Sequence, residues 1–134
     1  MANTIVNSPN APAPIGPYSH AVMAGNTLYI SGQIALSVET GNLVNDTIEA
    51  ETHQVMKNLQ AILQEAGMDF ANVAKCTIFV KDLNNFAKIN EVYGSYFTVN
   101  PPARETVEVS RLPKDVNVEI SAIAVNNSEN HYRG

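Results

Sequence analysis

Two charged side chains in the last third of the chain have the right type for chemistry on a small anionic molecule. Arg104 follows Pro101-Pro102-Ala103, whose prolines make a rigid approach to the next segment. A guanidinium can hold a carboxylate through two parallel hydrogen bonds, although most arginines are only exposed surface charges. Glu119 stands in a run of Val, Ile and Ala, where a charge is rarely buried unless it is paired. It is therefore a candidate general base or water-holding group, with a salt bridge as the alternative.

Three neutral side chains are further candidates, each with a structural role as the alternative. Tyr18 and Ser31 offer hydroxyls near the ends of a predicted hairpin. Asn90 lies in the middle of a predicted helix, where asparagine is a poor helix former, so it could satisfy a buried polar group. Cys76 follows the apolar pattern of its strand and is interpreted as a small core residue. One cysteine and three histidines without partner spacing predict neither a disulfide nor a metal site.

The composition limits the classes of function. The chain has 134 residues, of which 45% are hydrophobic and 16% charged, and this predicts one packed domain over 1–134. A net charge of −5 opposes nucleic-acid binding, which relies on Lys and Arg to neutralise phosphates. We see no signal peptide and no apolar run of roughly 18 residues, so we expect a cytoplasmic protein that does not cross a membrane. No phosphate-binding loop, dinucleotide fingerprint or nucleophile elbow occurs.

Hydrophobic periodicity predicts the elements that must position these residues. Prolines make residues 1–12 an extended arm, and the polar residues 126–134 are expected to form a frayed tail. Strands are expected over 20–24 and 28–31, with Gly32 ending the second. Apolar residues at helical spacing predict a helix over about 47–66, capped by Asp46 and stopped by Gly67. The other predicted elements are a strand over 73–80, a helix over about 83–97 capped by Asp82, and strands over 104–111 and 116–125.

The resulting order β-β-α-β-α-β-β predicts an α+β fold, with two helices on one face of a mixed sheet. Alternation assigns one set of strand residues to the face under the helices: Ala74, Cys76, Ile78, Val80, Val116, Val118, Ile120, Ala122 and Ala124. Val107 and Val109 fit the same apolar set, which places Arg104 and Glu119 together on the opposite face. That face mixes polar and apolar residues, a composition that favours a subunit interface with a wet pocket over plain solvent exposure.

Four segments, taken in order, resemble the motifs of one protein family. They are Ala13-Pro14-Ile15-Gly16-Pro17-Tyr18-Ser19; Tyr29-Ile30-Ser31-Gly32-Gln33-Ile34; Lys81-Asp82-Leu83-Asn84-Asn85-Phe86 with Ile89-Asn90-Glu91-Val92-Tyr93; and a signature made of Pro102-Ala103-Arg104, Val107-Glu108-Val109, Arg111-Leu112-Pro113-Lys114-Asp115 and Val118-Glu119-Ile120. Over about residues 13–125 the sequence resembles the reactive intermediate deaminase (Rid, YjgF-like) family, in particular its archetypal 2-iminobutanoate/2-iminopropanoate deaminase subgroup. Four motifs at family spacing make this resemblance specific.

The resemblance implies a chorismate-mutase-like fold and a homotrimer with clefts between subunits. It implies hydrolysis of 2-iminobutanoate and 2-iminopropanoate to 2-keto acids and ammonia, without a cofactor. By motif position, Arg104 would hold the substrate carboxylate and Glu119 the attacking water. Further residues would line the cleft: Tyr18, Ser31, Gly32 and Asn90. The implied ligand is a small 2-imino or 2-keto acid, and neither a metal, a nucleic acid nor a membrane is expected.

Two residues depart from the family pattern. Glu105 stands where a small residue is usual, and by alternation it points away from the Arg104 side. Thr106 stands where Cys or Ala is frequent, shares the side of Arg104 and is expected to line the substrate pocket. These departures leave open a second function, in which the same cleft binds a small carboxylate for regulation. An endoribonuclease activity, attached to some relatives of the family, is opposed by the charge of −5.

Overall fold

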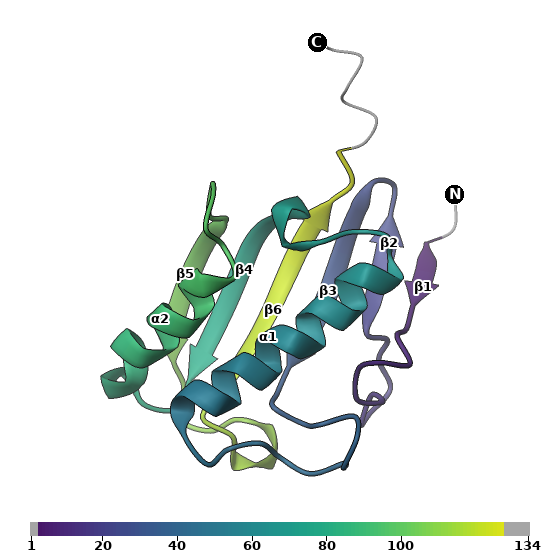
Figure 1. The fold of residues 1–134 in the computed structure, drawn as a ribbon. Helices are drawn as coiled ribbons and strands as arrows, with labels where there is room; N and C mark the ends of the chain where they lie inside the picture. Colours follow the sequence, from purple (N-terminus) through teal and green to yellow (C-terminus); the bar gives the residue numbers. More distant parts are fainter. Residues whose placement is uncertain (1–2, 128–134) are drawn as a thin grey trace.

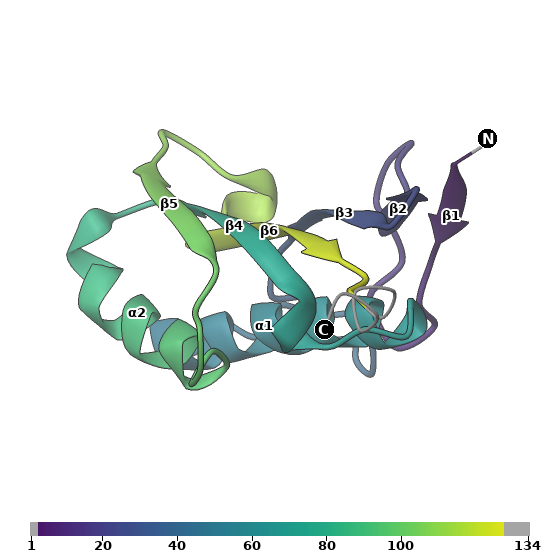
Figure 2. The ribbon, with the colours of Figure 1, turned by 90° about the horizontal axis from the view of Figure 1, so that it is seen from above.

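The computed structural model describes residues 3–127, which form a sheet with two helices on one of its faces (Figures 1 and 2). The strands are β1 Thr4–Val6, β2 Ala21–Ala24, β3 Thr27–Gln33, β4 Val73–Val80, β5 Ala103–Glu108 and β6 Val118–Val125. The helices are α1 Ile48–Glu65 and α2 Phe86–Ser95, with 3₁₀ turns at Phe70–Asn72, Leu83–Asn85 and Pro113–Asp115. The strand order is β1-β2-β3-β6-β4-β5, in which only β4 and β5 run parallel within the described sheet. The predicted α+β fold is confirmed.

The N-terminal part of the sheet differs in two details from the prediction. The arm contains a short strand, β1, which pairs antiparallel with β2 so that Ile5 lies opposite Val22. Gly32 does not end β3, because the pairing with β6 shifts register between Ile30 and Gln33 and the strand continues through the irregularity. Most of the predicted tail, from residue 128 onward, lies outside the described residues.

Helix α1 buries the apolar stripe that its sequence spacing predicts. Its wholly buried residues include Val55, Met56, Leu59, Ile62 and Leu63. The N-cap is Thr47 rather than the predicted Asp46, because the Thr47 hydroxyl accepts the Ala50 N–H at 3.0 Å. Gly67 follows the last turn with φ of +73°, a left-handed conformation in which glycine is the favoured residue, as predicted.

The second predicted helix divides into two parts. Asp82 accepts the Asn84 N–H at 2.9 Å and so caps the 3₁₀ turn Leu83–Asn85, after which α2 begins.

A buried carboxylate joins α1 to the chain just before β6. Glu51 is fully buried and accepts the backbone N–H of Asn117 at 2.8 Å and its Nδ2 at 2.9 Å. These bonds fix the position at which β6 enters the sheet.

The face assignments hold for β6 and most of β4, but the assignment of β5 was wrong. Parallel pairing sets Arg104 beside Cys76 and Thr106 beside Ile78, so these even-numbered residues lie under the helices. Val107 pairs with Phe79 on the open face and is 44% exposed, because an edge strand need not bury its apolar residues. In β4 the predicted burial of Ala74 was also wrong: an irregularity beside it exposes Ala74 and buries Val73.

Candidate functional site

Arg104 lies on the edge strand β5, and its side chain reaches helix α2. Its Nη1 donates to Asn90 Oδ1 at 2.5 Å. Its guanidinium carbon lies 5.2 Å from the centre of the Tyr93 ring and 5.5 Å from that of Phe86. Phe86, Asn90 and Tyr93 share one helix face because their spacing is i, i+4, i+7. These four residues are called the arginine cluster.

No carboxylate of residues 3–127 forms an ion pair with the Arg104 guanidinium of the arginine cluster. The salt bridges found in that part of the chain join Lys75 to Glu105 and Arg111 to Asp115. A guanidinium has five N–H donors in a planar fork, and the Asn90 amide takes one of them. The remaining donors are suited to a planar anion with two oxygens, such as a carboxylate.

Polar atoms continue from the arginine cluster into the core. The Thr106 hydroxyl is buried and has no hydrogen-bond partner among the described residues. The Tyr93 hydroxyl faces the Cys76 thiol, and burial raises the pKa of both groups. Cys76 is therefore a protonated core residue, as the sequence predicts, and no candidate nucleophile.

Glu119 lines a second hollow, called the glutamate pocket, with a volume of about 370 Å³. Its other lining residues are Ile15, Tyr18, Ser31, Gly32, Ile34 and Pro113. The Glu119 carboxyl is half-buried without an ion pair in the described chain, and burial raises its pKa. The salt bridge considered as an alternative is therefore not found there. A carboxyl of this kind can take a proton from water more readily than an exposed one.

The glutamate pocket depends on a close approach between β3 and β6. A Cβ placed on Gly32 would lie 2.7 Å from Glu119 Oε2, a distance that side chains do not tolerate. Ser31 Oγ donates to the Ser19 carbonyl at 2.7 Å, and the Ile15 N–H donates to the Tyr18 hydroxyl at 3.3 Å. These bonds hold the segment 15–19 against β3. Ser31 and Tyr18 thus line the pocket and also fix its wall.

The two groups of candidate residues lie on opposite faces of the sheet. Arg104 is under the helices beside Cys76, whereas Glu119 pairs with Phe79 on the open face. The expectation that they share a face was wrong, because the parallel pairing of β5 with β4 turns the even-numbered residues of β5 toward the helices. Phe86 and Tyr93 were not expected to contact the arginine, although their spacing around Asn90 is a usable signal. One chain therefore presents two candidate half-sites.

Glu105 belongs to neither half-site. As predicted, it points away from the Arg104 side, and it lies on the open face of the sheet. Thr77 Oγ1 donates to its carboxylate at 2.9 Å, and Lys75 Nζ is 3.2 Å away. The Thr77 hydrogen bond and, after it, Lys75 lower the pKa of Glu105. The departure at residue 105 therefore changes the open face and leaves the surroundings of Arg104 untouched.

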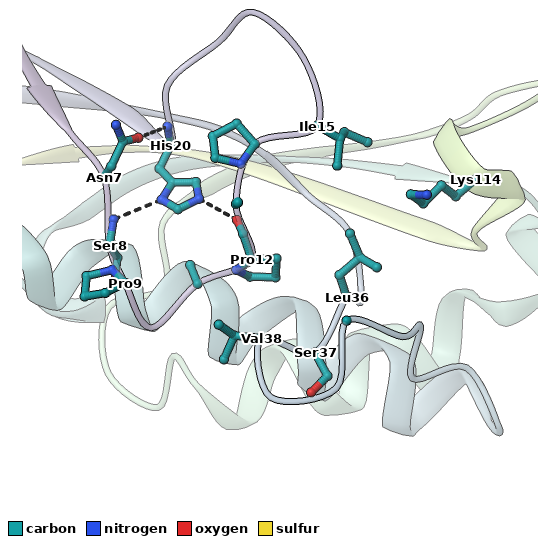
Figure 3. A pocket seen from close by; sticks show the side chains of 14 residues that line it. Asn7, Ser8, Pro9, Pro12, Ile15, His20, Leu36, Ser37, Val38 and Lys114 are labelled. Atoms are coloured by element: carbon teal, nitrogen blue, oxygen red, sulfur yellow. Dashed lines mark hydrogen bonds between the residues drawn. The ribbon is translucent and has the colours of Figure 1, made fainter.

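A cavity of about 780 Å³ is lined in part by residues 12–15 and by none of the predicted site residues (Figure 3). Three of its lining residues bind His20. His20 Nδ1 accepts the Ser8 N–H at 3.0 Å, His20 Nε2 meets the Pro12 carbonyl at 2.5 Å, and the His20 N–H donates to Asn7 Oδ1 at 2.8 Å. Figure 3 shows these bonds fastening the N-terminal arm. We therefore interpret this cavity as part of the architecture of the arm.

Two further observations concern metals and membranes. No group of three or more His, Cys, Asp or Glu side chains in residues 3–127 is arranged to hold a metal ion. Neither helix of the described chain combines the length and the apolar character needed to cross a membrane.

Comparison with known proteins finds many relatives of this chain, both in sequence and in structure. Residues 8–126 match a family model described as endoribonuclease L-PSP. A RutC family protein of Pyrococcus abyssi is 51% identical over 124 residues, covering 92% of this chain and 98% of the relative. The human 2-iminobutanoate/2-iminopropanoate deaminase is 44% identical over 125 residues, covering 93% and 91%. The crystal structure of E. coli TdcF with bound serine has a TM-score of 0.88 and 40% identity, covering 92% and 98%.

Proposed function

Because this chain belongs to the endoribonuclease L-PSP family, whose members also carry the names RutC and Rid, we propose that it hydrolyses 2-imino acids to 2-keto acids and ammonia. The observation that carries the proposal is the Arg104 guanidinium, which is held by Asn90 and has no carboxylate partner in the described chain. The name of the human relative supports 2-iminobutanoate and 2-iminopropanoate as the substrates. No cofactor is needed for the proposed reaction, and we place it in the cytoplasm.

The complete site is proposed to form between subunits of a homotrimer. Its basis is the separation of the half-sites: the arginine cluster lies under the helices and the glutamate pocket on the open face. A second chain can bring its glutamate pocket against the arginine cluster of the first. The open face suits an interface, since Tyr29 is 50% exposed there and borders a hollow of about 240 Å³ with Lys75 and Ile123.

The chemistry needs mainly positioning, because the C=N carbon of a 2-imino acid is already electrophilic. Arg104 holds the substrate carboxylate, and Glu119 holds a water against that carbon. Glu119 takes a proton from the water as the new C–O bond forms and passes it to the nitrogen, which gives a carbinolamine with one hydroxyl and one amino group. Glu119 then takes the hydroxyl proton as the carbonyl forms and the C–N bond breaks, and it passes this proton to the departing nitrogen, which leaves as ammonia. The net change adds one water and releases one ammonia.

The direct test is hydrolysis of an imine made in place. An amino-acid oxidase acting on 2-aminobutanoate produces 2-iminobutanoate, and semicarbazide traps what remains. We expect the protein to lower the amount of semicarbazone and Arg104→Ala to abolish this effect. Lys57→Ala is the matched control, since it removes an exposed cation of α1 outside both half-sites. The proposal fails if the wild-type protein leaves trapping unchanged, and the role of Arg104 fails if its alanine variant remains active.

A second candidate is small-carboxylate binding without turnover, which is favoured by one observation on a relative. The E. coli TdcF structure holds serine, an amino acid with the same carboxylate group. Calorimetric binding of 2-oxobutanoate by a protein that leaves imine trapping unchanged would select this candidate. RNA cleavage is not proposed despite the descriptive name of the family, since the chain has a net charge of −5.

A further inference from the structure

We propose that Phe86 and Tyr93 are positioning residues that hold the Arg104 guanidinium between two aromatic rings and so fix the edge it presents to a carboxylate. The inference deepens the proposed function and rests on it for the identity of the carboxylate. It concerns two residues that contact the arginine and not the reacting atoms.

The distances place the cation within the range of both rings. The guanidinium carbon is 5.2 Å from the Tyr93 ring centre and 5.5 Å from the Phe86 ring centre, and attraction between a cation and a ring face extends to about 6 Å. The Tyr93 ring is only 5% exposed and is itself fixed by Phe97, whose ring centre lies 4.8 Å away. Phe86 lies nearer the surface, at 38% exposed. Tyr93 thus forms a buried, rigid wall of the arginine site, and Phe86 forms its more exposed rim.

Aromatic faces stabilise the cation without neutralising it. A carboxylate in their place would compete with the substrate for the same N–H donors, and none is found beside Arg104 in the described chain. The Asn90 amide occupies one donor and sets the rotation of the fork, while the rings restrict its movement to either side. An arginine ordered before binding loses less side-chain freedom when the carboxylate arrives.

The Tyr93 hydroxyl has a different neighbour from the ring face. It faces the Cys76 thiol in the core, and burial raises its pKa, so the ring remains neutral. The face of the ring, and not the hydroxyl, therefore meets the cation. Tyr93→Phe is expected to preserve binding, whereas Tyr93→Leu removes the ring face.

The test is a series of mono-, di- and trifluorophenylalanine at position 86, which weakens the negative face of the ring with little change in shape. We expect the Kd of 2-oxobutanoate and the KM for the imine to rise stepwise with fluorination, with kcat little changed. Phe86→Leu is expected to raise both constants about tenfold. A role in packing alone predicts constants that do not follow fluorination, and that result would overturn the inference.

A ligand-free readout separates this inference from the proposed function. The Nε–H resonance of Arg104 should carry a ring-current shift that Phe86→Leu and Tyr93→Leu reduce and Tyr93→Phe retains. Circular dichroism identifies any variant that fails to fold. If the wild-type protein hydrolyses no imine but the resonance and the Kd respond as expected, the proposed function fails and the positioning role stands. If hydrolysis is normal and neither the resonance nor the fluorinated series responds, the positioning role is wrong.

Discussion

Two inactive variants are expected to restore activity when they share one oligomer. Arg104→Ala removes the arginine cluster, and Glu119→Gln removes the carboxyl of the glutamate pocket. These half-sites lie on opposite faces of the sheet, so the proposed cleft takes the arginine of one subunit and the glutamate of another. Each variant alone lacks one half in every cleft. A mixed oligomer contains some clefts in which both halves are intact.

The magnitude follows from the arrangement. With equal amounts and random assembly, half of the arginine clusters are intact, and half of the glutamate pockets facing them are intact. About a quarter of the clefts are therefore complete, and the activity should be about a quarter of the wild-type value in a cyclic oligomer. Activity should follow the product of the two subunit fractions and reach its maximum at equal amounts.

The assay is imine hydrolysis with semicarbazide trapping after the two variants are unfolded together in urea and refolded. Each variant refolded alone is the negative control. A second mixture sharpens the test: wild-type subunits with a double variant that carries both substitutions. In equal amounts, a cleft shared between subunits gives about a quarter of the wild-type activity, whereas a site within one chain gives about half.

Two results would refute the reasoning. Mixed oligomers of the two single variants, verified by native mass spectrometry, could be inactive at every ratio. The mixture with the double variant could retain half of the wild-type activity. Either result would mean that Arg104 and Glu119 act within one subunit, and the separation of the half-sites would then have no functional meaning.

Three further variants test single features. Burial raises the pKa of Glu119, so kcat/KM should rise with pH along a limb centred above 4.5 that Glu119→Gln abolishes. A raised folded-state pKa means that the carboxyl opposes folding as the pH rises through it, so Glu119→Gln should raise the urea midpoint more at pH 7 than at pH 4. Gly32→Ala should lower kcat about tenfold, because the added Cβ would displace Glu119. Gly94→Ala is the control and should keep its activity, since its Cβ meets nothing within 4 Å. Equal activities of the two variants would exclude crowding of Glu119 by residue 32. Thr47→Ala should lower the free energy of unfolding by about 1 kcal/mol in urea titrations, and a larger loss for Asp46→Ala would contradict the observed cap.

The sequence predicts those parts of the fold that local patterns determine. The β-branched run over 73–80 coincides with β4, and the apolar spacing of α1 gives its buried face. The side of β5 could not be predicted, since pairing with β4 sets it. The run holds charges on both parities, and its valines, Val107 and Val109, favoured burial of the odd-numbered residues. The strand β1 could not be predicted either, because three residues carry too little pattern to separate a strand from an extended arm.

The sequence predicts candidate site residues by type, but it does not predict how the structure groups them. Arg104 and Asn90 were expected near one cleft, and they share a hydrogen bond. Tyr18, Ser31 and Glu119 were also expected together, and they line one pocket. The division between these two groups depends on sheet register, which cannot be obtained from alternation within a single strand.

The strand order has a consequence for folding during synthesis on the ribosome. β6 is made last among the strands of the described chain, yet it lies between β3 and β4 in the middle of the sheet. Until it is added, the hairpin side and the β4–β5 side have no hydrogen-bond ladder between them. Synthesis proceeds from the N-terminus at about 5–20 residues per second, so the two sides remain unjoined until Val118–Val125 has been made. Glu119 arrives on that same strand, and the step that closes the sheet also delivers the carboxyl of the glutamate pocket.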